Sequence, residues 1–217
     1  MHGKENAARA ALGMVRAGTT LGLGTGSTAE VFIRMLAERN RRKNMHLKCV
    51  ATSKASERLA KKMGLKVAGL DKVGKIDLAV DGADQVDRRL NLIKGGGGAH
   101  AREKVVGYAA GKFVVIVDES KLCTVLHGKI PLEILPFAFP LVKRVVGLQF
   151  GAKVVARDVK SDNGNVLADA FFGRVPDPRD LESWLDGVPG VVANGLFTKN
   201  VHSVIVGTAK GARVMGR

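Results

Sequence analysis

Short apolar segments alternate with segments of helical periodicity along the first half of the chain. Strands are predicted at 19–23, 47–51, 76–80 and 113–117, and helices at 28–39, 54–63 and 99–110. The strand at 76–80 is apolar on both faces, as in a strand buried within a parallel sheet. Strands joined by helices in this order form βαβ units, whose crossover connections keep the strands parallel. The alternation therefore predicts a doubly wound α/β domain.

The pattern changes after about residue 122, where three prolines interrupt a short stretch. Two strands at 153–159 and 166–172 flank a turn at 162–165, and a helix at 177–186 and a strand at 191–197 follow. These elements are typical of a small α+β unit inserted into the larger domain. A last apolar strand at 203–206 is placed to return to the main sheet. We therefore expect one domain from 1–125 and 198–217, and a smaller one from 126–197.

A glycine-rich segment, Gly22-Leu23-Gly24-Thr25-Gly26-Ser27-Thr28, joins the first predicted strand to its helix. Glycines at such a turn let the backbone approach a ligand, and the helix N-terminus offers free N–H groups. Ser27 and Glu30 have the spacing of a capping box. The segment matches neither the Walker A pattern nor GxGxxG. It indicates a pocket for one small phosphate, with a purely structural turn as the alternative.

Two carboxylates, Asp81 and Asp84, follow the predicted strand 76–80 in the sequence Asp81-Gly82-Ala83-Asp84. In open α/β sheets, ligands bind beyond the carboxyl ends of the strands. Carboxylates at this place could bind sugar hydroxyls or transfer protons. The nearby Asp87 is more typical of a turn former.

Four consecutive glycines, Gly95 to Gly98, follow Lys94. Ordering them costs much conformational entropy, so inside a βαβ unit they indicate backbone wrapped closely around a ligand. Lys94 supplies a cation for a phosphate or a developing oxyanion. Glu103, early in the helix 99–110, is either a catalytic base or an acid that complements the helix dipole. Lys121 follows the strand 113–117 and is a candidate for a cation that faces the ligand.

The formal net charge is +15, from 35 basic and 20 acidic residues, which raises the question of nucleic-acid binding. Ten basic and two acidic residues lie between Arg34 and Lys62. No aromatic residue is interleaved among them for base stacking, so a solvated basic face is favoured. Non-specific contact with polyanions and steering of an anionic substrate remain alternatives.

Other classes of site and location find little support in the sequence. The five histidines are scattered without metal-ligand spacing, and no GxSxG motif is present. The two cysteines, Cys49 and Cys123, are expected to be buried or half-buried thiols. No apolar run approaches the roughly 18 residues of a membrane span, and the N-terminus does not resemble a signal peptide. We therefore expect a cytoplasmic protein without a membrane partner.

Taken together, nine segments resemble the ribose-5-phosphate isomerase A family. They are GLGTGSTA (22–29), ATSKAS (51–56), DLAVDGADQVD (77–87), NLIKGGGGA (91–99), REK (102–104), VDESK (117–121), PLE (131–133), DNGN (162–165) and GVVANGLF (190–197). The resemblance covers nearly the whole chain in the family's order. It implies an aldose–ketose isomerase that interconverts ribose 5-phosphate and ribulose 5-phosphate, with a Rossmann-like α/β domain and a smaller ferredoxin-like α+β domain.

The resemblance also implies roles for particular residues. Glu103 corresponds to the general base, and Asp81, Asp84 and Lys94 to the other catalytic groups. The implied substrate-binding residues are Thr25, Gly26, Ser27, Thr28, Gly82, Ala83, Gly95, Gly96, Gly97, Lys121 and Lys4. The family implies no metal ion or other cofactor, a small sugar phosphate as ligand, and a homodimer or homotetramer. The charge distribution described above predicts no specific nucleic-acid partner.

Two departures from the family pattern lie near these residues. Gln85 stands where the family usually has Glu, and we expect it to influence the field at Asp84. His100 replaces a usual aliphatic residue and is close to Glu103 in sequence. Three rival functions remain: a sugar-phosphate-sensing regulatory domain on the same fold, a transferase of the coenzyme A-transferase type, and a nucleic-acid binder with this scaffold.

Overall fold

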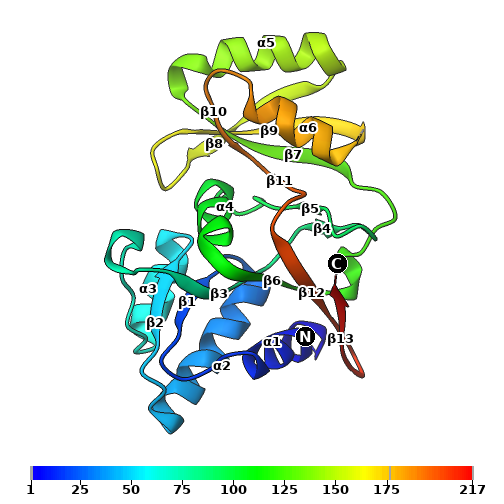
Figure 1. Ribbon diagram of the computed structural model, residues 1–217. Helices are drawn as coiled ribbons and strands as arrows, with labels where there is room; N and C mark the ends of the chain where they lie inside the picture. The colour runs from blue at the N-terminus through cyan, green and yellow to red at the C-terminus, as the bar shows by residue number, and fades with distance from the viewer. Residues whose placement is uncertain (1, 176, 217) are drawn as a thin grey trace. The chain divides into compact units, whose positions relative to one another are not determined.

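The computed structural model describes residues 2–175 and 177–216 (Figure 1). The chain divides into two compact units. The first unit comprises Met1–Ala83, Arg102–Leu122 and Asn200–Arg217, and the second comprises Asp84–Ala101 and Cys123–Lys199. The division differs from the expected one mainly in Asp84–Ala101, a segment that groups with the second unit.

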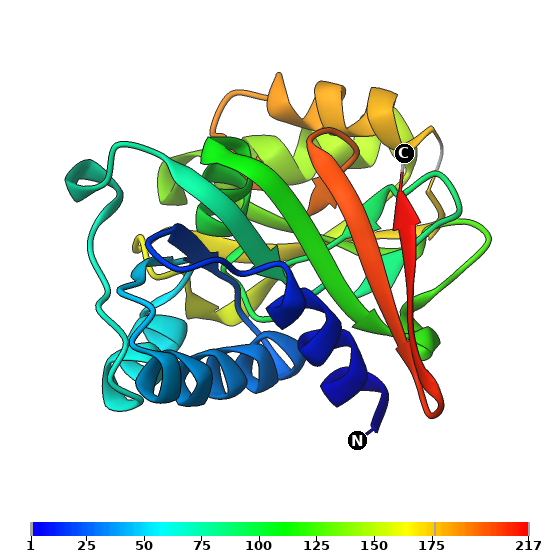
Figure 2. The same cartoon turned by 60° about the horizontal axis from the view of Figure 1, so that its bottom comes forward.

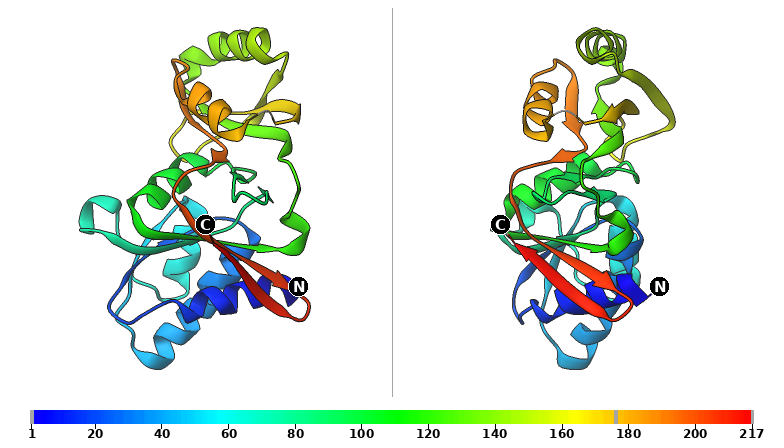
Figure 3. Two further views of the ribbon diagram at one scale, coloured as in Figure 1. Left: turned by 45° about the vertical axis from the view of Figure 1, so that its right-hand side comes forward. Right: turned by 90° about the vertical axis from the view of Figure 1, so that its right-hand side faces the viewer.

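The first unit contains a six-stranded sheet in the order β13-β12-β6-β3-β1-β2. Its strands are β1 (Thr20–Leu23), β2 (Lys48–Ala51), β3 (Ile76–Asp81), β6 (Ala110–Asp118), β12 (Val201–Thr208) and β13 (Gly211–Gly216). All neighbouring pairs are parallel except β12 and β13, which form the antiparallel hairpin seen in Figure 3. The predicted α/β sheet is confirmed, including the return of the chain into it near residue 203.

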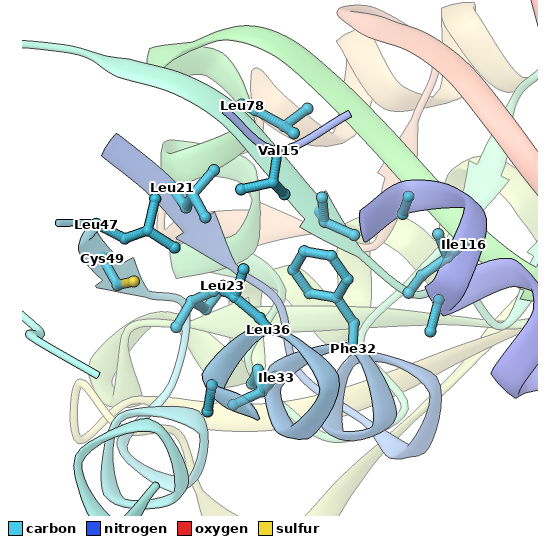
Figure 4. Close-up of a cluster of buried hydrophobic side chains, with 14 of the residues drawn as sticks. Val15, Leu21, Leu23, Phe32, Ile33, Leu36, Leu47, Cys49, Leu78 and Ile116 are labelled. Atoms are coloured by element: carbon cyan, nitrogen blue, oxygen red, sulfur yellow. The ribbon is translucent and has the colours of Figure 1, made fainter. Parts of the chain in front are cut away.

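Helices cover both faces of this sheet because its strands are apolar on both sides. The helices are α1 (His2–Gly13), α2 (Ser27–Lys43), α3 (Lys54–Lys62) and α4 (His100–Ala109), and short 3-10 turns lie at Leu70–Lys72 and Glu119–Lys121. Helices α1 and α2 lie side by side on one face (Figure 2). Leu21 and Leu23 of β1 pack into the buried cluster around Phe32 on that face (Figure 4). A Cβ on Gly22, between them, would meet Val106 of α4 at 2.6 Å, so α4 covers the other face.

The second unit is built on antiparallel strands. Its four-stranded sheet has the order β10-β7-β9-β8, and its three-stranded sheet has the order β11-β5-β4. The strands are β4 (Gln85–Val86), β5 (Leu92–Ile93), β7 (His127–Ile134), β8 (Lys153–Lys160), β9 (Val166–Arg174), β10 (Val191–Asn194) and β11 (Leu196–Phe197). Helices α5 (Phe139–Phe150) and α6 (Pro178–Asp186) share one apolar core with the larger sheet, and a 3-10 turn lies at Pro136–Ala138. The expected smaller α+β unit is therefore present.

One expectation for the second unit was wrong, and one of its strands was not predicted. The strand expected at 191–197 is two strands in different sheets, divided at Gly195. A Cβ on Gly195 would lie within 2.8 Å of Pro131 Cδ, so the chain changes sheets where only glycine fits. The proline-rich stretch contains a central strand, β7, that was not predicted. Pro131 lacks an N–H group, yet its carbonyl still accepts a 2.7 Å hydrogen bond from the N–H of Gly195.

Among the described residues, no helix combines the length and the apolar character needed to cross a bilayer.

Candidate active site

Asp81 ties the end of β3 to the turn between β1 and α2. Its carboxylate is 1% exposed, and Oδ1 accepts hydrogen bonds from the N–H of Thr25 at 2.9 Å and of Gly82 at 2.7 Å. A Cβ on Gly24 would collide with the Asp81 side chain and its Cα. Glycine at this position therefore brings the backbone of the turn against the carboxylate.

The Thr25 hydroxyl is held by three other hydroxyls. Its Oγ1 lies 2.7 Å from Thr52 Oγ1, 2.8 Å from Ser53 Oγ and 3.2 Å from Ser56 Oγ. Ser56 also donates a 2.6 Å hydrogen bond to the carbonyl of Gly24. Sequence reasoning gave no role to the family-like segment 51–56. Its hydroxyl groups hold the glycine-rich turn through hydrogen bonds to Thr25 and Gly24.

Helix α2 begins at Ser27, and its N-cap is Gly26 with φ of +102°. The expected capping box is absent: no side chain caps this helix, and Ser27 Oγ instead accepts a 2.8 Å hydrogen bond from Lys4 Nζ. The N–H groups of Ser27, Thr28 and Ala29 donate to no acceptor in the part of the chain that the structure describes. Free N–H groups, the positive end of the helix dipole and an adjacent ammonium group together favour an anion.

Glu103 and Lys121 are further parts of the first unit that sequence reasoning selected. Glu103 lies in the first turn of α4 and is 4% exposed. Lys121 ends the 3-10 turn after β6 and is half-buried. The hydrogen bond from Ser120, aided by the charges of Lys121 and Lys4, holds the pKa of Asp118 below its usual value despite partial burial. The positive charges of both lysines are therefore close enough to stabilise the carboxylate at the carboxyl end of β6.

Asp84 and Lys94 lie on the second unit, at the two ends of the β4–β5 hairpin. Asp84 is exposed, and its Oδ2 accepts a 2.8 Å hydrogen bond from the N–H of Gly96. Lys94 is 2% exposed, its N–H donates to the carbonyl of Gly195 at 2.8 Å, and its Nζ lies 5.5 Å from the centre of the Phe197 ring. The hairpin thus brings an acid to the glycine segment through this hydrogen bond and places a buried cation directly before Gly95.

The four glycines form an ordered turn. The N–H of Gly98 donates a 3.0 Å hydrogen bond to the carbonyl of Gly95, and both residues have positive φ, +75° and +100°. A Cβ on Gly95 would lie within 2.9 Å of His100 and Pro131 side-chain atoms. These residues are therefore glycine because the turn requires it, which argues against a flexible linker.

The chain matches a family model over residues 48–211, that of ribose 5-phosphate isomerase A (phosphoriboisomerase A). The ribose-5-phosphate isomerase A of Methanothermobacter thermautotrophicus is 44% identical, over 99% of this chain and 98% of its own length. The corresponding protein of Rhizobium meliloti is 41% identical, over 98% and 96%. This chain belongs to the ribose-5-phosphate isomerase A family.

Solved structures of the ribose-5-phosphate isomerase A family have the same fold. The structure from Methanocaldococcus jannaschii is 41% identical, covers 99% of this chain and 98% of its own, and superimposes with a TM-score of 0.94. A D-ribose-5-phosphate isomerase in complex with phospho-erythronic acid is 41% identical, with 99% and 97% coverage and a TM-score of 0.95. The Rossmann-like domain and the smaller antiparallel domain are therefore family features.

The two departures from the ribose-5-phosphate isomerase A pattern both lie in the second unit. Gln85 Nε2 donates to the carbonyl of His127 at 2.8 Å, and its Oε1 accepts from the His127 N–H at 3.0 Å. Among the described residues, Gln85 makes no hydrogen bond to Asp84. Its two hydrogen bonds instead connect β4 to the start of β7. His100 is fully buried in the first turn of α4, next to Gly95.

Sequence reasoning missed a further group of side chains that contacts the glycine turn. Arg157 of β8 donates to the carbonyls of two of the four glycines, Gly95 and Gly96, and pairs with Asp169 of β9. The signal that could have indicated this pair is Asp169, the single acid in the otherwise apolar strand 166–172. An acid buried in such a strand usually has a cationic partner.

Among the described residues, no group of three or more His, Cys, Asp or Glu side chains is arranged to hold a metal ion. The absence of a metal and of any other cofactor from the reaction stays a prediction.

Proposed function

We propose that this chain interconverts ribose 5-phosphate and ribulose 5-phosphate as an aldose–ketose isomerase (EC 5.3.1.6). The observation that carries the proposal is that the turn before α2 presents free helix N–H groups at 27–29 and is hydrogen-bonded to the buried carboxylate of Asp81 at the end of β3. Such a loop suits a small substrate with a phosphate at one end and a reacting carbon chain at the other. Relatives similar over their whole length carry the name of this reaction.

The phosphate binds at the N-terminus of α2 in this proposal. The N–H groups of Ser27, Thr28 and Ala29 and the Lys4 ammonium group supply donors and positive charge. Lys121 adds a second cation from the end of β6. Binding energy gained at the phosphate then positions the sugar carbons for reaction.

Asp81, Asp84 and Glu103 act on the same substrate molecule in this proposal. Asp84 follows Asp81 by three residues, so their Cα atoms lie within about 11 Å of each other whatever the conformation. Glu103 follows Gly98 by five residues and lies in the helix that begins directly after the glycine turn. Chain connectivity therefore supports assigning these groups to one reaction.

Glu103 is the general base of the proposed mechanism. Asp81 first transfers the proton that opens the sugar ring. Glu103 then removes the C2 proton of the open-chain aldose, and the C1 carbonyl oxygen becomes an oxyanion, which gives a cis-enediolate. A proton moves from O2 to O1, Glu103 returns its proton to C1, and the C2–O bond becomes the ketose carbonyl. A positioned base contributes about 10²–10⁴-fold, so stabilisation of the enediolate must supply more.

Lys94, Asp84 and the N–H groups of the glycine turn supply that stabilisation. Buried Lys94 brings a cation with little surrounding water to screen it, so its attraction to a developing oxyanion is strong. Asp84 fixes one N–H of the turn and accepts from a sugar hydroxyl. No metal or organic cofactor takes part.

The test is ketose formation from ribose 5-phosphate in the presence of EDTA, by the wild type and by Glu103→Gln. Glu103→Gln is expected to lose about 10²–10⁴-fold in kcat with little change in KM. Glu57→Gln is the matched control, because Glu57 lies on α3 and pairs with Lys61. Equal activity of both variants would refute the role of Glu103, and activity restored after EDTA by a divalent metal would refute the metal-free mechanism.

The alternative of a sugar-phosphate-sensing regulatory domain is not supported, since the full-length relatives are named as isomerases. We propose in addition a cytoplasmic location and a homodimer or homotetramer. Light scattering of the purified protein measures the number of chains directly.

A further inference from the structure

The guanidinium group of Arg157 joins the glycine turn to a buried carboxylate. Its Nη1 donates to the carbonyl of Gly95 at 3.0 Å and to that of Gly96 at 3.1 Å. Its Nη2 donates to Asp169 Oδ1 at 2.6 Å, and its Nε donates to Oδ2 at 3.2 Å. One planar group thus makes four hydrogen bonds in two directions, which lysine could not reproduce.

Asp169 holds the guanidinium group in place. Both side chains are largely buried, at 15% exposure for Arg157 and 10% for Asp169. Lys129 contributes a second cation, with Nζ 3.0 Å from Asp169 Oδ2, but it is 51% exposed. Burial raises the pKa of Asp169, and the hydrogen bonds and charges of Arg157 and Lys129 outweigh this effect and hold it below the usual value. The carboxylate is therefore ionised at neutral pH.

The direction of these hydrogen bonds determines which way the peptide groups of the turn face. In a trans peptide, C=O and N–H point in opposite directions. The Gly95–Gly96 peptide is held at both ends, by Arg157 at its carbonyl and by Asp84 at its N–H. The carbonyl of the next peptide, that of Gly96, also points to Arg157, so the N–H of Gly97 points away from Arg157.

The Gly97 N–H has no acceptor in the part of the chain that the structure describes, and Gly97 is exposed. A free, oriented backbone donor is what a developing oxyanion requires. The irregular pairing of β8 between Ala156 and Lys160 is where Arg157 leaves the regular ladder, and such irregularities often re-aim a side chain.

We propose that Arg157, anchored by Asp169, is a positioning residue that sets the glycine turn so that the Gly97 N–H donates to the reacting oxygens of the substrate. The inference rests on the proposed function, since it takes the glycine turn to contact the substrate. Arg157 itself touches only the turn and the carboxylate, so it acts through the backbone that it holds.

The test compares Arg157→Met with Lys129→Met. Each change removes one cation from Asp169, but only Arg157 contacts the turn, so a role limited to neutralising Asp169 affects both variants alike. Arg157→Met is expected to lower kcat between about tenfold and a hundredfold, the scale of a misplacement of about 1 Å. Lys129→Met is expected to keep the wild-type kcat, and KM is expected to change little in either variant.

Binding of phospho-erythronic acid gives a readout independent of turnover. This compound carries a phosphate at one end and a carboxylate at the other, in place of the reacting carbons. Calorimetry on Arg157→Met is expected to show weaker binding of this compound by a factor similar to the loss of kcat, and unchanged binding of inorganic phosphate. Equal effects of the two methionine variants on kcat and on binding would overturn the inference.

Arg157→Lys separates geometry from charge and also serves if Arg157→Met does not fold. A lysine keeps the charge but cannot contact Asp169 and two carbonyls together, so this variant is expected to stay impaired. Wild-type kcat in Arg157→Lys would show that charge alone suffices and would refute positioning. A wild type that binds phospho-erythronic acid but produces no ketose would refute the proposed function, while the binding comparison still tests Arg157.

Discussion

At the scale of single residues, Gly24 leaves no room for a side chain. A methyl group there would occupy the space of the Asp81 carboxylate. Gly24→Ala is expected to lower the free energy of unfolding by about 1–3 kcal/mol through overpacking. It is also expected to reduce kcat by about 100-fold, because Asp81 and the phosphate loop shift together.

Gly74→Ala is the matched control for this substitution. Nothing lies within 4 Å of a Cβ at Gly74, so both its stability and its activity are expected to equal those of the wild type. Urea denaturation and steady-state kinetics measure the two effects. Wild-type kcat in Gly24→Ala would show that Asp81 is not held by this contact.

The two cysteines are expected to react slowly in the folded protein. Burial raises the pKa of the Cys49 thiol to about 12, and burial together with the charge of Asp87 raises that of Cys123. A raised pKa keeps a thiol neutral, so at pH 8 only about one Cys49 in ten thousand is the reactive thiolate.

Reaction with a disulfide reagent at pH 8 checks this prediction. Half-buried Cys123 is expected to react first, and buried Cys49 only after urea is added. The variants Cys49→Ala and Cys123→Ala assign the two phases. Rapid reaction of Cys49 in the folded protein would contradict the burial of this thiol.

At the scale of elements, one buried carboxylate organises the turn between β8 and β9. Glu133 of β7 is 1% exposed, and its Oε1 accepts from Ser161 Oγ at 2.8 Å, Asn163 Nδ2 at 3.0 Å and Asn165 Nδ2 at 2.7 Å. These contacts explain why the family-like segments 131–133 and 162–165 occur together.

Glu133→Gln is expected to lower the free energy of unfolding by about 1–3 kcal/mol, because an amide, whose NH₂ group can only donate, replaces the carboxyl group that accepts three hydrogen bonds. Little change in kcat is expected, since the turn is not among the proposed catalytic groups. Urea denaturation measures the stability, with exposed Glu119→Gln as the control. An unchanged midpoint would show that the turn does not depend on this carboxylate.

At the scale of the whole molecule, the net charge of +15 is expected to attract the dianionic substrate. The value of kcat/KM is expected to fall several-fold between about 0.01 and 0.1 M salt, as the screening length shortens from about 30 to 10 Å. The value of kcat itself is expected to stay constant, because the bound substrate is little affected by distant charges.

The double variant Arg41→Gln and Arg42→Gln removes two charges from the last turn of α2. It is expected to weaken the salt dependence and to leave kcat unchanged. A chloride titration of kcat/KM for both proteins makes the comparison. A wild-type kcat/KM that does not change with salt would show that the basic face has no part in substrate capture.

The elements that sequence patterns predicted are those whose signal is local. The strands of the main sheet are short and apolar, and α2 to α4 follow regular turns and glycine stops, so their periodicity was sufficient. Helix α1 was missed because its sequence is polar and mixed in charge, and its burial comes from packing on α2 and β12. Strand β7 was missed because Pro131 argues locally against a central strand.

The sequence by itself determined the family, the parallel sheet and the residues that lie at the carboxyl ends of its strands, because these depend on nearest neighbours along the chain. Tertiary structure alone decided what holds those residues. The hydroxyls that bind Thr25 belong to Thr52, Ser53 and Ser56, which are separated from it by 27, 28 and 31 positions in the sequence. Arg157 and Gly95 are separated by 62 positions. Contacts at such separations leave no periodic signal, because the fold, and not the local chain, brings their partners together.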